Sequence, residues 1–343
     1  MKIGSRPNDL GVGDLNKDGK LDLAISHDES VTVLLNDARG GFTPAPGSPI
    51  KTAAHLIEVG DVNNDGNLDL ALTHHDSPGV QIFLGAGNGR FSVAPGSPFM
   101  AHQGTKGHNH GLTLSDLNSD GNLDITTSNQ DDNSVSVLLG NGRGSFAPAS
   151  GSPFAVGRAP YPHAVGDVNK DGNLDVVTPN VGGDSVSVLL GNGRGEFRTA
   201  TNSPISVAGR PFYVAIGEVN GDGNADLMMT HDDINLMTTL LGDGRGGFTA
   251  ARNSQFDLGR RGYFIVAADV TGDARTEVIV GLLGGDSLVV LVSSESGYTH
   301  APGSPYRAGL NPKVAIADFN GDGKRDIIAA GNDSSDITVL LRK

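Results

Sequence analysis

The 343-residue chain contains no cysteine and no tryptophan, and aromatic residues make up only 5% of it. Without cysteine it forms no disulfide, so other interactions must hold its loops together. It has no apolar run of about 18 residues, which excludes a membrane-spanning helix and predicts no membrane insertion. The first residues, Met1–Arg6, include no apolar signal core, so we expect no signal peptide in this chain.

What the chain has instead is glycine, with 50 residues, and an acidic segment of the pattern D-x-N-x-D-G-x-x-D that occurs seven times. The seven copies are residues 14–22, 61–69, 116–124, 167–175, 218–226, 269–277 and 318–326. Their first residues are 47, 55, 51, 51, 51 and 49 positions apart. A fixed period of this length indicates a propeller, a solenoid or an array. Because the units must share one core, we expect a single domain over residues 1–343.

The formal net charge of −14 would ordinarily indicate an acidic surface that repels nucleic acid. The seven loops hold 21 of the 39 acidic residues, at their first, fifth and ninth positions. One divalent cation in each loop would bring the protein close to neutrality. We therefore interpret the acidity as metal-site chemistry and predict no nucleic-acid partner.

Each acidic loop presents oxygen atoms with the spacing of a calcium site. Calcium takes about six to eight oxygen ligands; positions one, three, five and nine would supply side-chain oxygens, and position seven a backbone carbonyl. One such segment would be an ordinary turn, but seven copies that keep the ligand spacing favour calcium. An EF-hand is excluded because position twelve, where it needs glutamate, holds residues such as Ile25 and Leu72.

The predicted ligands are Asp14, Asn16, Asp18, Lys20, Asp22, Asp61, Asn63, Asp65, Asn67, Asp69, Asp116, Asn118, Asp120, Asn122, Asp124, Asp167, Asn169, Asp171, Asn173, Asp175, Glu218, Asn220, Asp222, Asn224, Asp226, Asp269, Thr271, Asp273, Arg275, Glu277, Asp318, Asn320, Asp322, Lys324 and Asp326. This predicts up to seven calcium ions. The sixth loop departs most from the pattern, with Thr271, Ala274 and Glu277 in place of Asn, Gly and Asp. We expect it to be the weakest site.

Each repeat predicts four antiparallel strands. A strand precedes the acidic loop, a second follows it, and a third, such as residues 185–190, leads through a Gly-Asn-Gly-Arg-Gly-x-Phe turn to a looser fourth strand near Gly-Ser-Pro. Four strands repeated seven times predict an all-β, seven-bladed β-propeller. The chain resembles the integrin α-subunit FG-GAP family and its bacterial VCBS-repeat relatives. The resemblance rests on the acidic loops, on the turns at 138–146 and 189–197, and on the Gly-Ser-Pro segments at 47–49, 96–98, 151–153 and 303–305. The resemblance implies a calcium-binding propeller, and it says little about function.

The expected blades are residues 8–50, 54–100, 109–156, 160–207, 211–258, 262–308, and 311–343 together with 1–6. The last repeat ends after its third strand, and residues 1–7 match residues 154–160, which form a fourth strand that leads into the next blade. We therefore expect the N-terminal strand to close the last blade and remove an open edge.

The loops of a propeller lie on two faces. The acidic loops, between the first two strands of each blade, take one face, and nine of the ten histidines map to the other. Polar loops can collect histidine without any function, but turns do not generally favour His or Tyr, and here they converge on the central mouth. Because this face varies from blade to blade while the acidic loops repeat, it favours one asymmetric pocket.

Two functions follow for the mouth. A recognition module, similar to the propeller lectins of this repeat family, would bind a glycan or a small acidic ligand through stacking and charge-assisted hydrogen bonds. The predicted ligand-binding residues are Arg158, Arg210, Phe212, Phe264, Lys313, His74, His75 and His231.

The alternative is an enzyme of the lyase or dehydratase type that acts on a sugar or uronic acid. The base would be His55, His110 or His163; the acid-base partner would be Tyr161, Tyr213 or Tyr263; and Arg158 or Arg210 would bind the carboxylate.

A variant of the enzyme reading places a transition metal on His55, His108, His110 and His163, because imidazole is a common ligand for such ions. The calcium loops themselves favour an extracellular or periplasmic setting, where calcium is abundant. Nothing in the sequence predicts the oligomeric state.

Overall fold

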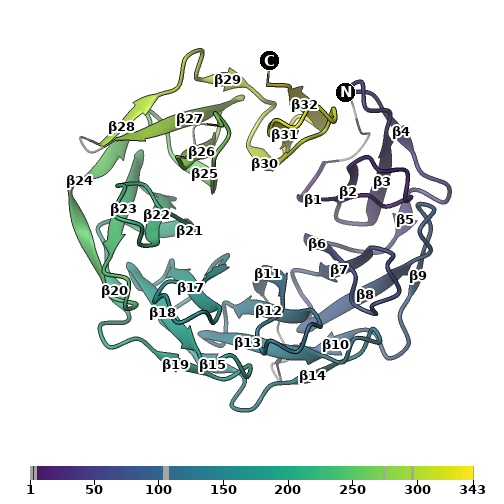
Figure 1. The fold of residues 1–343 in the computed structure, drawn as a ribbon, viewed down its shortest axis with the longest axis horizontal. Helices are drawn as coiled ribbons and strands as arrows, with labels where there is room; N and C mark the ends of the chain where they lie inside the picture. Colours follow the sequence, from purple (N-terminus) through teal and green to yellow (C-terminus); the bar gives the residue numbers. More distant parts are fainter. Residues whose placement is uncertain (1–2, 4–5, 103–107, 273–274, 295–296, 343) are drawn as a thin grey trace.

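Short runs of Val, Ile and Leu, separated by glycine-rich turns, give each repeat a small antiparallel sheet. The computed structural model describes residues 3, 6–102, 108–272, 275–294 and 297–342, and in it seven such sheets surround a central axis (Figure 1). The predicted seven-bladed propeller is confirmed. Every regular element in these ranges is a strand, and none of them contains a helix that could cross a bilayer.

Three strands of each blade follow one another outward from the axis. The innermost strands are β1 (Asp9–Gly13), β6 (Leu56–Gly60), β11 (Asn109–Ser115), β16 (Ala164–Gly166), β21 (Pro211–Gly217), β25 (Gly262–Ala268) and β30 (Pro312–Ala317). The second strands are β2 (Asp22–Ser26), β7 (Asp69–Thr73), β12 (Asp124–Asn129), β17 (Asp175–Asn180), β22 (Asp226–His231), β26 (Glu277–Leu282) and β31 (Asp326–Gly331). The third strands are β3 (Ser30–Asn36), β8 (Gly79–Gly85), β13 (Ser134–Gly140), β18 (Ser185–Gly191), β23 (Leu236–Gly242), β27 (Ser287–Ser294) and β32 (Asp336–Leu340).

The outer strand is interrupted in most blades. Its two halves are β4 (Phe42–Pro44) and β5 (Ile50–Lys51), β9 (Phe91–Val93) and β10 (Phe99–Met100), β14 (Phe146–Pro148) and β15 (Phe154–Ala155), β19 (Phe197–Thr199) and β20 (Ile205–Ser206), and β28 (Gly297–His300) and β29 (Tyr306–Arg307). A Ser-Pro pair precedes the second half of each; proline offers no N–H to the ladder. The serine hydroxyl accepts from the third strand instead, as Ser152 Oγ does from Val137 N at 2.9 Å. Blade 5 has Gln255 where the others have proline, and its β24 (Phe248–Asp257) is continuous.

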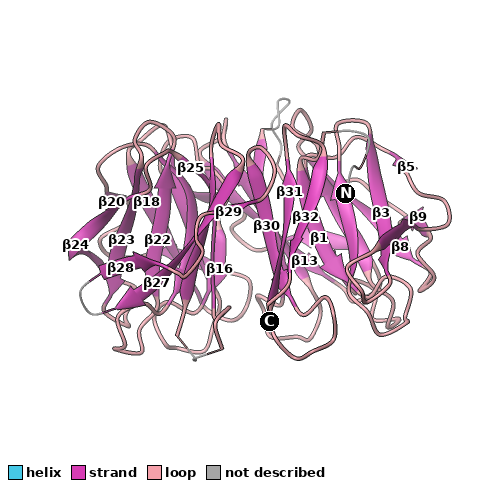
Figure 2. Ribbon diagram, turned by 90° about the horizontal axis from the view of Figure 1, so that it is seen from above, coloured by secondary structure: helices cyan, strands magenta, loops and turns pink. Residues whose placement is uncertain are grey.

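The hydrophobic core lies between the blades. Each cluster joins facing sheets, as when Val31 and Val33 of blade 1 meet Leu70 and Leu72 of blade 2. The last cluster joins blade 7 to blade 1, with Ile328 packed near Leu23 and Ile25. The ring is therefore closed by the same packing that joins consecutive blades. In side view the strands run between two faces on which the loops gather (Figure 2).

The predicted closing strand falls mostly on residues 1–2 and 4–5, which lie outside the described residues. Ile3, which is described, donates its N–H to Ser335 O at 3.1 Å, just before β32. Val156 and Val207 donate the equivalent bond to Asn133 and Asp184 in blades 3 and 4. Ile3 thus takes the place that the outer strand occupies in other blades, and it packs in the cluster that closes the ring.

Deletion of residues 1–6 is expected to lower the melting temperature, because it removes the Ile3 bond and its apolar contact at the closure of the ring. Circular dichroism during heating would measure the change. Val93→Ala, on an outer-strand residue that is 59% exposed, is the control and should melt like the unmodified protein. An unchanged melting temperature after the deletion would contradict the closure.

Candidate functional site

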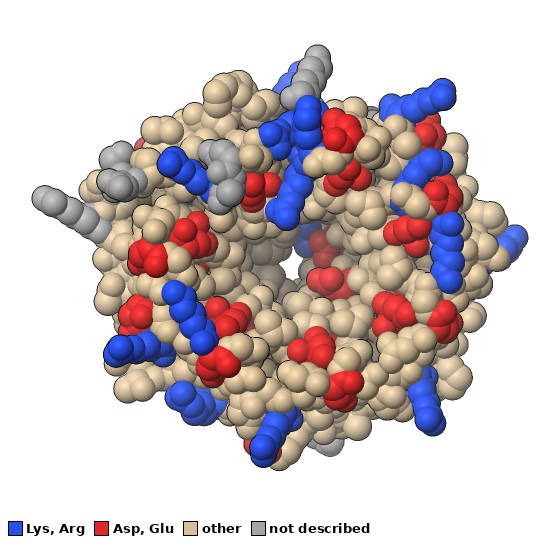
Figure 3. Space-filling model, viewed as in Figure 1, with Lys and Arg blue, Asp and Glu red and all other residues tan. Residues whose placement is uncertain are grey.

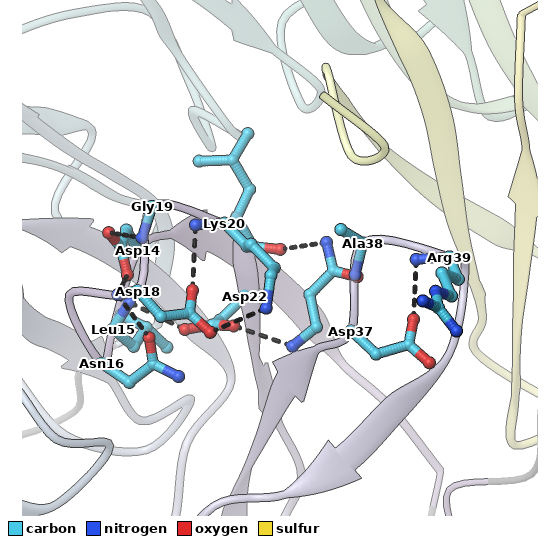
Figure 4. A network of polar contacts seen from close by, with 12 residues as sticks. Asp14, Leu15, Asn16, Asp18, Gly19, Lys20, Asp22, Asp37, Ala38 and Arg39 are labelled. Carbon is cyan, nitrogen blue, oxygen red and sulfur yellow. Dashed lines mark hydrogen bonds and ion pairs between the residues drawn. The ribbon is translucent and has the colours of Figure 1, made fainter. Parts of the chain in front are cut away.

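The exposed part of each acidic loop brings several oxygen atoms together (Figure 4). In the first loop, Asp14 Oδ1 and Asn16 Oδ1 both accept from the N–H of Asp18, at 3.1 and 2.9 Å. The same pair of bonds recurs at Asp120 and Asp322 in other loops. In the third loop Asn118 Nδ2 also donates to Asp120 Oδ2 at 3.0 Å, so the first, third and fifth side chains lie close together. Their carboxylate and amide oxygens are ligands of the kind that calcium takes.

The ninth residue of the loop is buried instead. Asp124 is fully buried; its Oδ2 accepts from Leu117 N at 2.9 Å, and its Oδ1 accepts from Gly140 N, at the end of β13, at 2.8 Å. One carboxylate therefore joins the loop, the second strand and the third strand. Burial raises the pKa of this group to about 6, against the opposing effect of the two N–H donors. Its role as a calcium ligand stays a prediction.

The sixth loop is built differently. Glu277 Oε2 accepts from both Val270 N and Thr271 N at 2.9 Å, and its Oε1 is buried with no hydrogen-bond partner in the described part of the chain. The extra methylene of glutamate shifts the carboxylate, so the bond to the third strand is lost. Arg342 donates to the carbonyl of Thr271, which places a fixed cation beside this loop. Asp273, a predicted ligand, and Ala274 lie outside the described residues.

Acidic side chains gather in patches around a central opening (Figure 3). On the face away from the acidic loops, a row of rings follows the rim of the axis from blade 2 to blade 6. The ring centroids are 5.0 Å apart for His75 and His110, 4.2 Å for His110 and Tyr161, 4.6 Å for Tyr161 and Phe212, and 6.2 Å for Phe212 and Tyr263. The two shortest contacts are stacked. Side chains from blades 2 to 6 therefore form one continuous wall.

Below this wall the innermost strands enclose a cavity of about 230 Å³. It is lined by charged and hydrogen-bonding side chains, chiefly Asp9, Glu58, Lys313, His163 and Tyr213. Lys313 Nζ lies 3.3 Å from Asp9 Oδ1, which links blade 7 to blade 1. His163 Nδ1 bonds Ser128 Oγ at 2.8 Å, while its Nε2 is buried with no hydrogen-bond partner among the described residues. The cavity thus has one polar atom that a ligand could satisfy.

Three buried histidines near the axis, of which His163 lines the cavity, are neutral imidazoles at physiological pH. Burial, with Lys313 nearby, lowers the pKa of His55 to about 3. Burial likewise lowers the pKa of His110 and of His163 to about 4. A neutral imidazole can accept a hydrogen bond or a proton at one ring nitrogen.

The acids at the cavity keep their protons. Burial, assisted by the neighbouring Asp9 carboxylate, raises the pKa of Glu58 to about 8. Burial also raises the pKa of Tyr161 to about 12, and that of Tyr213 well above its ordinary value. These groups act as hydrogen-bond donors near pH 7, and the two tyrosines are poor bases.

A family model described as FG-GAP-like repeat matches the chain three times, over residues 14–72, 61–127 and 116–178. Those ranges contain the first four acidic loops, and sheets of the same kind continue through the other three blades. The chain is an FG-GAP-like repeat propeller. No curated protein is similar to it in sequence.

Solved propellers resemble this FG-GAP-like protein in fold. BBS1N, crystallised in complex with ARL6DN, is 14% identical with a TM-score of 0.68, and the match covers 100% of this chain and 94–95% of that one. An Agrocybe aegerita lectin that recognises non-reducing terminal N-acetylglucosamine is 21% identical with a TM-score of 0.59, covering 94% of this chain and 85% of the lectin. A virginiamycin B lyase from Staphylococcus aureus is 13% identical with a TM-score of 0.60, covering 100% and 98%. At these identities the likeness shows the fold alone.

Several predicted mouth residues of the FG-GAP-like protein lie elsewhere. His231 is fully buried and bonds Thr238 Oγ1 at 2.8 Å, so a ligand at the mouth does not reach it. Arg158 and Arg210 are exposed and line no part of the cavity, and Arg210 pairs with Asp232 at 3.1 Å. Neither arginine of the predicted carboxylate clamp lines the cavity, and their role stays a prediction. A cation that does line the cavity is Lys313, which comes from a strand rather than a loop.

The histidines of the predicted transition-metal site also lie differently from the prediction. Counted from the acidic loop, His163 lies two positions further along its blade than His55 and His110 do in theirs, and it faces the cavity, where it bonds Ser128. His108 approaches His75 instead, with ring centroids 4.6 Å apart. His74 turns inward at the same loop, where its Nδ1 accepts from Asp76 N at 3.2 Å.

Sequence reasoning missed Glu58, the most perturbed carboxyl group of the cavity. It stands three residues before its acidic loop, where the other blades have Gly11, Thr113, Ala164, Ala215, Val266 and Ala315. A single charged residue among small or apolar equivalents was the available signal. Aligning the seven innermost strands would have shown it.

A larger hollow of about 550 Å³ lies between blades 5 and 6, against Asn220 and Tyr298. Its lining consists of amide, hydroxyl and aliphatic groups, and the hydroxyl of Tyr298 already bonds Thr239 Oγ1 at 3.0 Å. Among the described residues no charged side chain lines this hollow, so the axial cavity is the better functional candidate.

Glu58→Gln is expected to stabilise the protein increasingly as pH rises from about 4.5 to about 8. Below that window the carboxyl is protonated in both folded and unfolded chains. Within it the unfolded chain ionises Glu58 and the folded chain does not, so the unmodified protein loses stability relative to the variant. Urea unfolding of both proteins at pH 5, 7 and 9 measures the difference. A pH-independent difference would show that Glu58 has an ordinary pKa.

Proposed function

We propose that this FG-GAP-like propeller is a recognition module that binds a small carbohydrate at its central mouth. The observation that carries the proposal is the axial cavity. Aromatic rings, hydrogen-bonding groups, an acidic side chain and a basic side chain all line it. Drug-sized ligands occupy pockets of roughly 300–1,000 Å³. A cavity of about 230 Å³ suits one sugar ring whose substituents extend into the mouth.

The chemistry of the lining supports a polyhydroxylated ligand. Protonated Glu58 and the Tyr213 hydroxyl offer donors, the Nε2 of His163 offers an unpaired polar atom, and Lys313 and Asp9 offer both charges. The ring wall above gives the C–H face of a sugar an apolar surface. Tyr161 is stacked between His110 and Phe212, so its ring is held in place by neighbours from two other blades.

The fold comparisons are consistent with this proposal, since one similar propeller is a lectin for terminal N-acetylglucosamine. The likeness concerns fold and adds no contact in this chain. The asymmetry of the mouth supports one central site rather than a ring of identical ones, because the innermost strands carry different side chains in each blade.

A second candidate, an eliminating lyase or dehydratase, is favoured by one specific observation. Neutral His163 and protonated Glu58 line the same cavity, which supplies a base and an acid at the same pH. In such a reaction a histidine removes the proton beside a carboxylate or carbonyl, and the acid protonates the leaving oxygen. One structural neighbour is a lyase.

Glycan-array screening followed by calorimetry is expected to give saturable, stoichiometric binding of one sugar class, with one ligand per chain. Phe264→Ala and His163→Ala should weaken binding at least tenfold, about 1.4 kcal/mol, because each removes a wall of the cavity. Val93→Ala, on the outer strand, should bind as the unmodified protein does.

Incubation with uronic-acid polysaccharides, monitored by ultraviolet absorbance of a new double bond, tests the alternative. Turnover that is lost in His55→Ala or His163→Ala would favour the enzyme. If the protein shows neither saturable glycan binding nor turnover, both proposed functions of the mouth, carbohydrate recognition and elimination, are overturned.

We further propose that the acidic loops hold calcium, which would stabilise the blades where disulfides are absent and would suit an extracellular or periplasmic protein. The loop oxygens at positions one, three and five support this, as does the net charge of −14. The ion would neutralise like charges that the bare loops keep close together.

Chelation with EDTA is expected to lower the melting temperature, by mass action on a ligand that binds only the folded chain. Asp120→Ala, at an exposed fifth position, should lower it in calcium but not in EDTA. Asp124→Ala should lower it in both buffers, because it orphans two buried N–H groups at about 1–3 kcal/mol each. Calorimetric melts of the three proteins would check this, and equal curves with calcium and EDTA would contradict the calcium sites.

A further inference from the structure

The rim of the mouth holds a histidine cluster whose chemistry goes beyond the carbohydrate proposal, although the ring of His75 also belongs to the wall around the mouth. Ligand atoms of His75, Asp76 and His108 all lie within 4.8 Å of one another, and no other such set of three His, Asp or Glu side chains is found in the described ranges. His75 and Asp76 come from the β7–β8 loop of blade 2, and His108 directly precedes β11 of blade 3. The cluster therefore joins two blades.

Local structure presents these side chains toward one another. Ser77 N donates to His74 O at 3.2 Å, which closes a tight turn with His75 and Asp76 at its tip. Asn109, fully buried, donates its Nδ2 to Ser77 O at 2.9 Å and so ties this turn to the neighbouring blade. The two loops are thus joined by the buried Asn109 side chain and a backbone carbonyl, rather than by the side chains of the cluster.

His108 is oriented as a metal ligand is. Its Nδ1 lies 3.0 Å from Asp131 Oδ2, which leaves Nε2 directed to Asp76, 3.8 Å from Oδ1. Histidines that bind metals generally donate their second ring N–H to a carboxylate, which fixes the tautomer. His75 Nδ1 lies 3.5 Å from the same Asp76 oxygen. Two atoms bound to a tetrahedral zinc ion are about 3.3 Å apart, so small side-chain rotations would complete the site.

We propose that His75, Asp76 and His108 bind a divalent transition-metal ion of the zinc class, with Asp131 as the carboxylate that orients His108. Two imidazoles and one carboxylate select zinc-like ions over calcium, which prefers oxygen alone. Three protein ligands leave a fourth position open, as in zinc sites that take a water or a ligand. The ion would connect blades 2 and 3 at the rim of the mouth.

The test measures zinc by mass spectrometry after dialysis in calcium-containing buffer, with affinity from calorimetric titration of zinc chloride. The expected result is one zinc ion per chain. His75→Ala and His108→Ala should lose it, and Asp131→Asn should weaken binding about 10–100-fold while His75 and Asp76 remain in place. Cobalt(II) in place of zinc should give the visible absorbance of a four-coordinate site, lost in the same variants.

His300→Ala is the matched control, because His300 is an exposed histidine outside the cluster; it should bind zinc as the unmodified protein does. Circular dichroism of each variant confirms the fold, and Asp76→Asn provides a second ligand variant on an exposed loop. The proposal is overturned if the unmodified chain binds no zinc, if His75→Ala and His108→Ala retain it, or if His300→Ala loses it equally. None of these outcomes depends on carbohydrate binding.

Discussion

The structure depends on one buried carboxylate in each blade. In six blades the last residue of the acidic loop accepts one N–H from the loop itself and one from the end of the third strand or the residue just after it, as Asp22 does from Leu15 and Asn36. In the sixth blade Glu277 makes only the loop contacts. Buried donors cost about 1–3 kcal/mol each when left unpaired. This contact fixes where the loop turns, and with it the face on which the exposed loop oxygens lie.

That division of the ring into two faces organises the function. The exposed oxygens at the first, third and fifth positions lie outside the blade, while the strands that follow carry the chain to the opposite face. On that face the residues at the start of the innermost strands differ from blade to blade. The rings gathered there, from His75 to Tyr263, pack against one another around the axis. A repeating scaffold thus supports a single asymmetric cavity, since only the scaffold contacts need to be the same in each blade.

Burial at the axis sets the chemistry of the mouth. Seven strands converge there, so side chains that face inward lose water without gaining a full set of partners. Burial favours the neutral form of both bases and acids: the pKa of His55 falls to about 3, and that of Glu58 rises to about 8. Lys313 and Asp9 form an ion pair in the same cavity, with Nζ and Oδ1 3.3 Å apart. The histidines at the outer rim, which are less buried, are available for a different role.

The sequence by itself determined the seven blades, the strand order and the face that varies, because a nine-residue pattern at a near-constant period leaves few other folds. It also identified His55, His110, Tyr161 and Tyr213 as residues of the mouth. Only the tertiary structure decided which of these meet. It buried His231, directed Arg210 to Asp232, brought Glu58 and Lys313 into the cavity, and set His75 beside His108. Such contacts join residues of different blades, and their distances follow from the twist and packing of the whole ring.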